Sequence, residues 1–160
     1  MSNPVVIDVV PGTSYADLTR EFDAPVEAVF EAHADPELYK RWIGPRALET
    51  VITHWDFRTG GGYGFEQTDA EGTYGFRGVI HTVIENELII QTFEFLGAPG
   101  EVSLDRLRFE ALPDGRTRLV GRSVMTSKEA LDAMIASGME YGVREGYEKL
   151  DDLLLEGETP

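Results

Sequence analysis

Histidines are the first residues to test for catalytic chemistry, because an imidazole near neutral pH can act as a base or bind a metal. The chain has three of them, His33, His54 and His81. His33 falls on the apolar face of an expected helix, which favours a buried structural side chain over a base. His54 and His81 stand alone in strand-like runs. His54-Trp55-Asp56 puts two polar groups on one strand face, and two ligands do not make a metal site. We therefore predict no metal site and no cofactor.

A glycine-rich stretch and scattered carboxylates are the other features that suggest chemistry. Residues 60–64 (Gly-Gly-Gly-Tyr-Gly) resemble a phosphate-binding loop. They lack the Lys-Ser/Thr ending and the following helix of such a loop, so we predict a hairpin turn. The chain has no cysteine, which excludes disulfides and thiolate chemistry. No Ser-His-Asp order and no pair of catalytic carboxylates is evident. An enzyme would have to use Asp105 or a histidine as its general acid or base.

The alternation of side chains along the strand-like runs predicts an inward face that is mostly aromatic and partly polar. Its apolar members are Tyr63, Phe65, Tyr74, Phe76, Ile89, Phe93, Phe95, Leu107, Phe109 and Leu119. Its polar members are Gln67, Gln91, Ser103, Asp105 and Ser123. A few polar groups among many aromatic ones are typical of a small-molecule pocket. For Ser103 and Asp105, a position near a strand end in contact with water explains the polar side chain as well as a pocket does. The candidate ligand-binding residues from the strands are Phe65, Gln67, Phe76, Gln91, Phe93, Phe95 and Asp105.

The last helical stretch supplies three further candidates, Met134, Met139 and Gly142. Gly142 and Gly146 both fall on the predicted buried face, where each costs about 1 kcal/mol relative to alanine. Together they form a notch. For Gly146 we favour close packing as the reason, whereas for Gly142 close packing and space for a ligand are equally supported. Met134 and Met139 carry flexible thioethers, which adapt to ligands of varied shape.

Local signals predict the elements that position these residues, beginning with one strand that ends at residues 19–22. A helix follows, with Asp23 as its expected N-cap. Asp35-Pro36 begins a second short helix by the same chemistry. Turns rich in glycine, asparagine and aspartate then separate six strand-like runs, at 47–57, 62–68, 73–84, 88–95, 102–111 and 117–124. Connections this short join antiparallel neighbours, which predicts a meander.

A capping box formed by Thr126 and Glu129 predicts the start of one final helix over residues 128–155. A helix of that length spans roughly 40 Å and must lie across the sheet. The elements together predict an α+β fold, in which a curved antiparallel sheet wraps around a long C-terminal helix and two short helices follow the first strand. We expect one domain over residues 1–160, with its core at about 15–155.

Composition limits the partners and the compartment. The formal net charge of −15 repels phosphate backbones and anionic lipid heads, so we predict no binding to nucleic acid or to membranes. The acidity mainly favours solubility, with recruitment of a basic protein as the lesser alternative. No run approaches the roughly 20 apolar residues of a membrane helix. The first residues do not resemble a secretory signal, so the cytoplasm is the expected location.

Motifs spread over most of the chain, from about residue 15 to 155, resemble a known family. The matching stretches are Arg20-Glu21-Phe22-Asp23-Ala24-Pro25, Asp35-Pro36-Glu37-Leu38, Trp42-Ile43-Gly44-Pro45, Asp56-Phe57-Arg58-Thr59-Gly60-Gly61, Phe76-Arg77-Gly78, Gln91-Thr92-Phe93-Glu94-Phe95, Gly115-Arg116-Thr117-Arg118-Leu119 and Gly146-Tyr147-Glu148-Lys149-Leu150. In order and spacing they are similar to bacterial proteins related to the activator of the heat-shock chaperone ATPase, within the START-like (SRPBCC) superfamily. The resemblance implies a helix-grip fold. It implies much less about function, because one fold hosts many activities.

Three functions from different classes fit these observations. The leading hypothesis is a binding protein for a hydrophobic or amphipathic small molecule, held in an internal pocket. The second, suggested by the resemblance, is a co-chaperone-like regulator that binds a protein partner such as a heat-shock ATPase. The third is a cyclase- or hydrolase-like enzyme that uses the same pocket, for which no catalytic residue is assigned.

Overall fold

The computed structural model describes residues 3–157, which form an eight-stranded antiparallel sheet crossed by a long helix. The strands are β1 (Val6–Val9), β2 (Tyr15–Phe22), β3 (Glu49–Asp56), β4 (Gly62–Asp69), β5 (Gly72–Ile84), β6 (Leu88–Phe95), β7 (Val102–Leu112) and β8 (Arg116–Val124). The helices are α1 (Val26–Ala34), α2 (Pro36–Trp42), α3 (Lys128–Ala136) and α4 (Met139–Gly157), with a 3₁₀ turn at Pro113–Gly115. The predicted α+β fold and its six-stranded meander are confirmed.

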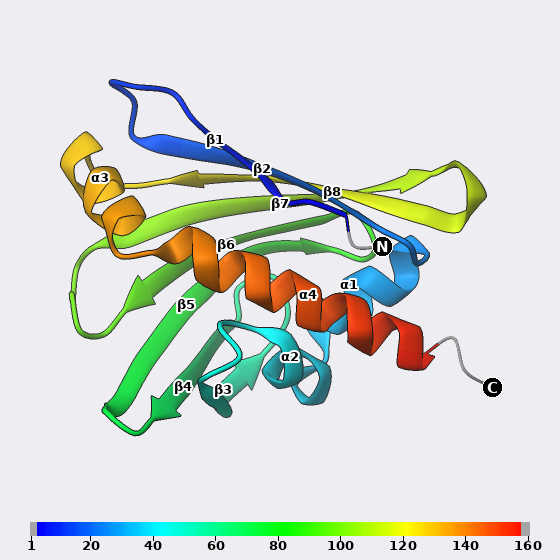
Figure 1. Ribbon diagram of the computed structural model, residues 1–160, viewed down its shortest axis with the longest axis horizontal. Coiled ribbons are helices and arrows are strands. Elements are labelled where there is room, and N and C mark those ends of the chain that lie inside the picture. Colours follow the sequence, from blue (N-terminus) through cyan, green and yellow to red (C-terminus); the bar gives the residue numbers. More distant parts are fainter. Residues whose placement is uncertain (1–2, 158–160) are drawn as a thin grey trace.

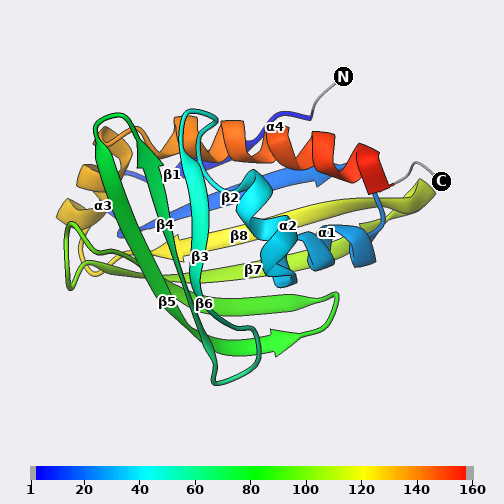
Figure 2. The ribbon, with the colours of Figure 1, turned by 90° about the horizontal axis from the view of Figure 1, so that it is seen from below.

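The meander β3 to β8 follows the chain order, and β2 closes it by pairing with β8 along its whole length. The strand order is β1-β2-β8-β7-β6-β5-β4-β3. Figure 2 shows that the sheet curls strongly, so that β3, β4 and β5 cross the direction of β2 and β8 at a steep angle. The prediction of one strand before the first helix was wrong, because a short edge strand, β1, pairs with β2. Four residues of alternation are too few to stand out in a sequence.

The two short helices follow the sheet's first hairpin, and their caps differ from each other. The Asp35 carboxylate accepts a hydrogen bond from the Glu37 amide and Pro36 opens α2, as predicted. Asp23 does not cap α1, which begins after Pro25 without a side-chain cap. The Asp23 carboxylate instead pairs with the Arg116 guanidinium at 2.9 Å, a partner supplied by a distant strand.

The predicted single closing helix is two helices, which corrects the expectation for residues 128–155. The chain turns at Ser137-Gly138, where Gly138 has a φ of +87° that other residues rarely adopt. Ser127, one residue later than predicted, caps α3 through the Ala130 amide. The hydroxyl of Thr126 donates to Glu101 instead. In Figure 1, α3 lies at one end of the sheet, outside the line of α4.

Helix α4 lies across the concave face of the sheet (Figures 1 and 2). An ion pair fixes it there. The Arg20 guanidinium, from β2, donates to both carboxylate oxygens of Asp151 at 2.7 and 2.6 Å. It also lies over the Phe22 ring, 4.7 Å from its centroid. Because Arg20 is 2% exposed, this pair anchors α4 inside the fold. The core beneath it is largely aromatic, and its rings come from α1, α2, α4 and the sheet.

Candidate functional site

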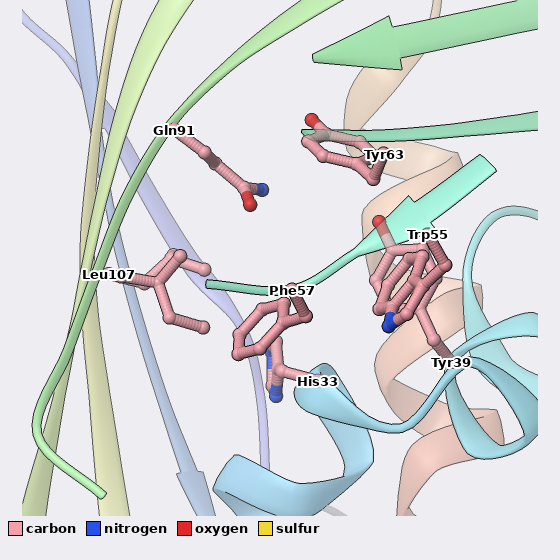
Figure 3. Close-up of a pocket in the computed structure, with 8 residues that line it drawn as sticks. His33, Tyr39, Trp55, Phe57, Tyr63, Gln91 and Leu107 are labelled. Carbon is pink, nitrogen blue, oxygen red and sulfur yellow. The ribbon is translucent and has the colours of Figure 1, made fainter. Parts of the chain in front are cut away.

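A small cavity lies inside the core, where α1 and α2 meet the concave face of the sheet (Figure 3). Its volume is about 10 Å³ and its lining residues are His33, Tyr39, Trp55, Phe57, Tyr63, Ile89, Gln91 and Leu107. A volume of this size holds about one water molecule. The cavity can therefore take a small polar group but not a whole drug-sized ligand.

Gln91 is the one predicted ligand-binding residue that lines this cavity. Figure 3 shows its amide pointing from β6 toward the middle of the cavity. The amide has no hydrogen-bond partner among residues 3–157. The nearby Tyr63 hydroxyl is occupied, because it donates to the Thr92 carbonyl at 2.6 Å. Gln91 thus offers an unpaired amide to a molecule that enters here.

Asp105 lies beside Gln91, directly opposite it in the β6–β7 register. One carboxylate oxygen, Oδ1, accepts hydrogen bonds from both Ser123 at 2.7 Å and Ser103 at 3.0 Å. Burial raises the pKa of the Asp105 carboxyl, and the two serine hydrogen bonds partly oppose that rise. Asp105 keeps intermediate exposure, and it is not among the residues that line the cavity. Asp105 and Gln91 are neighbouring polar side chains on adjacent strands.

Three buried tyrosines surround this polar group. Burial is the main cause of the raised pKa of the Tyr39, Tyr63 and Tyr147 hydroxyls, and the negative charge of Asp105 adds to the rise in each. The hydroxyls of Tyr39 and Tyr147 have no hydrogen-bond partner within residues 3–157. Polar atoms from α2, α4, β4, β6 and β7 thus gather in one region of an aromatic interior.

The predicted phenylalanines form a continuous row that leads from this region to the surface. The Phe65 and Phe76 rings stack at 5.0 Å, and Phe76 contacts both Phe93 at 5.4 Å and Phe95 at 5.3 Å. Exposure rises along the row, from 2% at Phe65 to 37% at Phe95. Phe95 ends β6, next to the β6–β7 loop. We call these four residues the aromatic row.

The remaining candidates lie apart from the cavity. The Gln67 amide donates to the Ile43 carbonyl at 3.2 Å and to the Thr50 hydroxyl at 3.3 Å, which ties the α2–β3 connection to β4. Met134 belongs to α3 and Met139 begins α4. Because the closing helix is divided between them, these two methionines belong to different helices, and neither lines the cavity.

The two glycines of α4 pack against the end of α2 and the connection after it. A Cβ on Gly146 would lie 3.1 Å from the Trp42 carbonyl oxygen, which is close packing, as we had favoured. A Cβ on Gly142 would lie 3.5 Å from Cδ of Pro45, an ordinary contact. Gly142 therefore has room for a methyl group and faces the α2–β3 connection.

Four of the eight lining residues, Tyr63, Ile89, Gln91 and Leu107, were predicted to face inward, whereas Tyr39, Trp55 and Phe57 were not predicted. Tyr39 lies on α2, and its position in the sequence pattern does not distinguish a cavity residue from an ordinary core residue. Trp55 faces inward because a register shift between Ile52 and His54 reverses the alternation of β3. Its indole donates to the Ala34 carbonyl at 2.9 Å. A bulge of this kind has no reliable signature in the sequence.

Metal and membrane sites receive no support from the part of the chain that the structure describes. Within residues 3–157, no three histidine or acidic side chains are placed to hold a metal. Asp56 pairs with Arg58 at 3.0 Å, and His54 is exposed. The 60–64 stretch leads from β3 into β4, as the hairpin prediction requires. No helix in this part of the chain is long and apolar enough to cross a bilayer.

A larger crevice opens between the residues that precede β1 and helix α4. It measures about 240 Å³ and is lined by Asn3, Pro4, Val5, Arg20, Arg144, Tyr147 and Glu148. Its two cations already have carboxylate partners, since Arg20 pairs with Asp151 and Arg144 with Glu140. The crevice therefore offers no free cation to a ligand.

A curved antiparallel sheet around a long C-terminal helix, with a partly polar interior between them, defines the helix-grip class of the SRPBCC superfamily. Comparison with protein families identifies the family within that class. The family described as activator of Hsp90 ATPase homolog 1-like protein matches residues 23–155, and the chain belongs to this family. The resemblance stated from the motifs is confirmed.

Solved bacterial structures show the same fold. The crystal structure of protein Ms6760 from Mycobacterium smegmatis is 26% identical, with a TM-score of 0.84 over 94% of this chain and 97% of that one. A solution structure from Arthrobacter aurescens is also 26% identical, with a TM-score of 0.85 over 94% and 91% of the two chains. A crystal structure from Rhodobacter sphaeroides is 25% identical, with a TM-score of 0.86 over 96% and 99%. The comparison with curated proteins finds no match.

Proposed function

We propose that the protein binds a small hydrophobic or amphipathic molecule between α4 and the concave face of the sheet. The observation that supports this function is the aromatic row, whose exposure rises from the core to the surface. Inward-facing rings normally become fully buried in a filled core. Rings that stay partly exposed on a concave face provide an apolar surface for a ligand.

The small volume of the cavity limits how such a ligand is held. About 10 Å³ accommodates one small group, so the larger part of the molecule lies along Phe93, Phe76 and Phe95. Helix α3 lies at one end of the sheet (Figure 1). Leu131 is the buried residue of α3, so this helix is held by few core contacts and can adjust at low cost.

Binding is tested with a neutral fluorescent probe, N-phenyl-1-naphthylamine, whose emission increases in apolar surroundings. Phe95→Lys puts an ammonium group at the outer end of the aromatic row. Burying or crowding a charge against an apolar ligand costs more than about 1.4 kcal/mol, so we expect at least a tenfold weaker affinity. Native mass spectrometry of protein purified from its own host then identifies any molecule that is retained.

The adjacent residue provides a matched control. Leu96 is 45% exposed, and its side chain lies against Gly75 on the other face of the sheet. Leu96→Lys makes the same change of charge one residue away and should leave probe affinity unchanged. Equal loss of binding in both variants, or no binding by the unmodified protein, would contradict the proposed function and leave a protein partner as the alternative.

A further inference from the structure

Asp105 is a carboxylate inside the fold that lacks a cationic partner. Within residues 3–157 it takes part in no ion pair, and the Ser103 and Ser123 hydroxyls both donate to the same oxygen, Oδ1. The second oxygen, Oδ2, receives no hydrogen bond from these residues. Carboxylates deep in a protein are ordinarily paired or fully hydrogen-bonded. The second oxygen is therefore available to a donor from outside the chain.

The groups near Asp105 include further oxygens that can accept hydrogen bonds, together with aromatic faces. Gln91 lies opposite it in the β6–β7 register and points its amide into the cavity (Figure 3). The Tyr39 hydroxyl, which also has no partner in the described chain, comes from the cavity's other side. The lining also contains the rings of Trp55 and Phe57, stacked at 6.0 Å. Carboxylate, amide and phenol oxygens among aromatic rings suit a cationic donor.

Size and charge both favour an ammonium group over a larger cation. The cavity is lined by Gln91 and not by Asp105, which lies opposite Gln91 in the β6–β7 register. It holds about one water-sized group, at about 10 Å³, which is also the size of a primary ammonium. A guanidinium or a quaternary ammonium would be too large without rearrangement. The net charge of −15 raises the concentration of organic cations at the protein surface.

We propose that the ligand is a primary amine with an apolar body, whose ammonium group binds Asp105 and Gln91 while its body lies along Phe93, Phe76 and Phe95. This inference rests on the proposed function, because it names the class of molecule for the same interior site. The ammonium donates to Oδ2 of Asp105 and to the Gln91 amide oxygen. The aromatic row then accounts for the apolar body, and the serines hold the carboxylate in place.

The inference is tested with two probes that share one apolar body, 2-phenylethylamine and 2-phenylethanol. Each is titrated against the protein at pH 7 by calorimetry and by displacement of N-phenyl-1-naphthylamine. A charge-assisted hydrogen bond to a carboxylate should make the amine bind about tenfold to a hundredfold more tightly than the alcohol. The preference should persist in about 0.5 M salt, which suppresses attraction to the exposed acidic surface.

Asp105→Asn removes the charge and keeps the shape, and the two serines can still donate to the amide oxygen. In this variant the amine should lose its advantage over the alcohol. The control is Asp114→Asn in the distant β7–β8 turn, which makes the same change of net charge. Its φ of +66° is one that asparagine tolerates, and the preference for the amine should be unchanged.

The possible results distinguish a failure of the amine inference from a failure of the proposed small-molecule binding. Equal affinities of the two probes for the unmodified protein would overturn the amine inference, whether or not the variant folds. A preference that survives Asp105→Asn would also overturn it. In either case, displacement of the fluorescent probe by both compounds would leave the proposed function standing. No binding of any of the three compounds would refute the function itself.

Discussion

His33 provides a sharp test of the core, because its imidazole is buried without a charged partner. The ring is 5% exposed and packs edge-on against Trp42 and Phe109, with centroid distances of 4.9 and 5.1 Å. Its Nδ1 lies 2.8 Å from the Val29 carbonyl oxygen. Because a carbonyl only accepts, Nδ1 carries the proton of the neutral ring. Burial lowers the pKa of His33 from 6.5 to about 4, with the Val29 hydrogen bond acting in the opposite direction.

This shift predicts how stability depends on pH. The folded state binds fewer protons on His33 than the unfolded state does, so the free energy of unfolding falls as pH drops from about 6.5 toward about 4. With about 1.4 kcal/mol for each pH unit of difference, the full loss approaches about 3 kcal/mol. Between pH 7 and pH 5 the expected loss is about 2 kcal/mol. Carboxyl groups with a lowered pKa, such as those of Glu21 and Glu94, contribute mainly below this range.

The assay is urea unfolding at pH 7, 6 and 5, analysed with a constant dependence of the unfolding free energy on urea concentration. His33→Phe keeps the ring contacts and removes the titrating group. It should stay within about 1 kcal/mol of the unmodified protein at pH 7 and lose less stability on going to pH 5. His81→Gln, at an exposed position on β5, should retain the original loss. The reasoning is refuted if His33→Phe loses as much stability between pH 7 and pH 5 as the unmodified protein does.

Two further predictions concern α4. Gly142→Ala should raise stability by up to about 1 kcal/mol, because its methyl meets Pro45 at an ordinary 3.5 Å. Gly146→Ala should lower stability by about 1–3 kcal/mol, since its methyl lies 3.1 Å from the Trp42 carbonyl oxygen. Thermal unfolding compares the two variants, and a Gly146→Ala variant more stable than Gly142→Ala would contradict the packing described. Asp151→Ala should cost about 3–5 kcal/mol by leaving the Arg20 guanidinium buried and unpaired. The control Glu156→Ala breaks the exposed pair with Arg41 and should cost at most about 1 kcal/mol in the same urea titration. If Asp151→Ala and Glu156→Ala cost the same, the Arg20–Asp151 pair is not an anchor.

The elements that the sequence predicted correctly depend on contacts within a few residues. The α2 cap needs only Asp35 to reach the Glu37 amide, and the hairpins need only their turn residues. The alternation of β6 and β7 was enough to put Gln91 and Asp105 on the inward face. These features are local, so composition and spacing determine them before any tertiary contact forms.

The errors arose where distant residues decide the outcome. Asp23 is a good N-cap by type, yet Arg116, more than ninety positions later in the chain, takes its carboxylate. Residues 128–155 are compatible with one helix, because a glycine inside a helical pattern is tolerated at a modest cost. The turn at Gly138 lets Leu131 become buried at the end of the sheet, a gain that appears only when the sheet is in place.

The candidate site shows the same difference between features set by local contacts and features set by distant ones. The sequence by itself determined the α+β meander, the inward aromatic face and the presence of polar groups on it. Only the tertiary structure decided that Asp105 pairs with Gln91 in register, that the bulge in β3 turns Trp55 inward, and that Tyr39 closes the cavity. The physical reason is range: caps and turns are decided within a few residues, whereas register, burial and cavity shape depend on contacts between segments far apart in the chain.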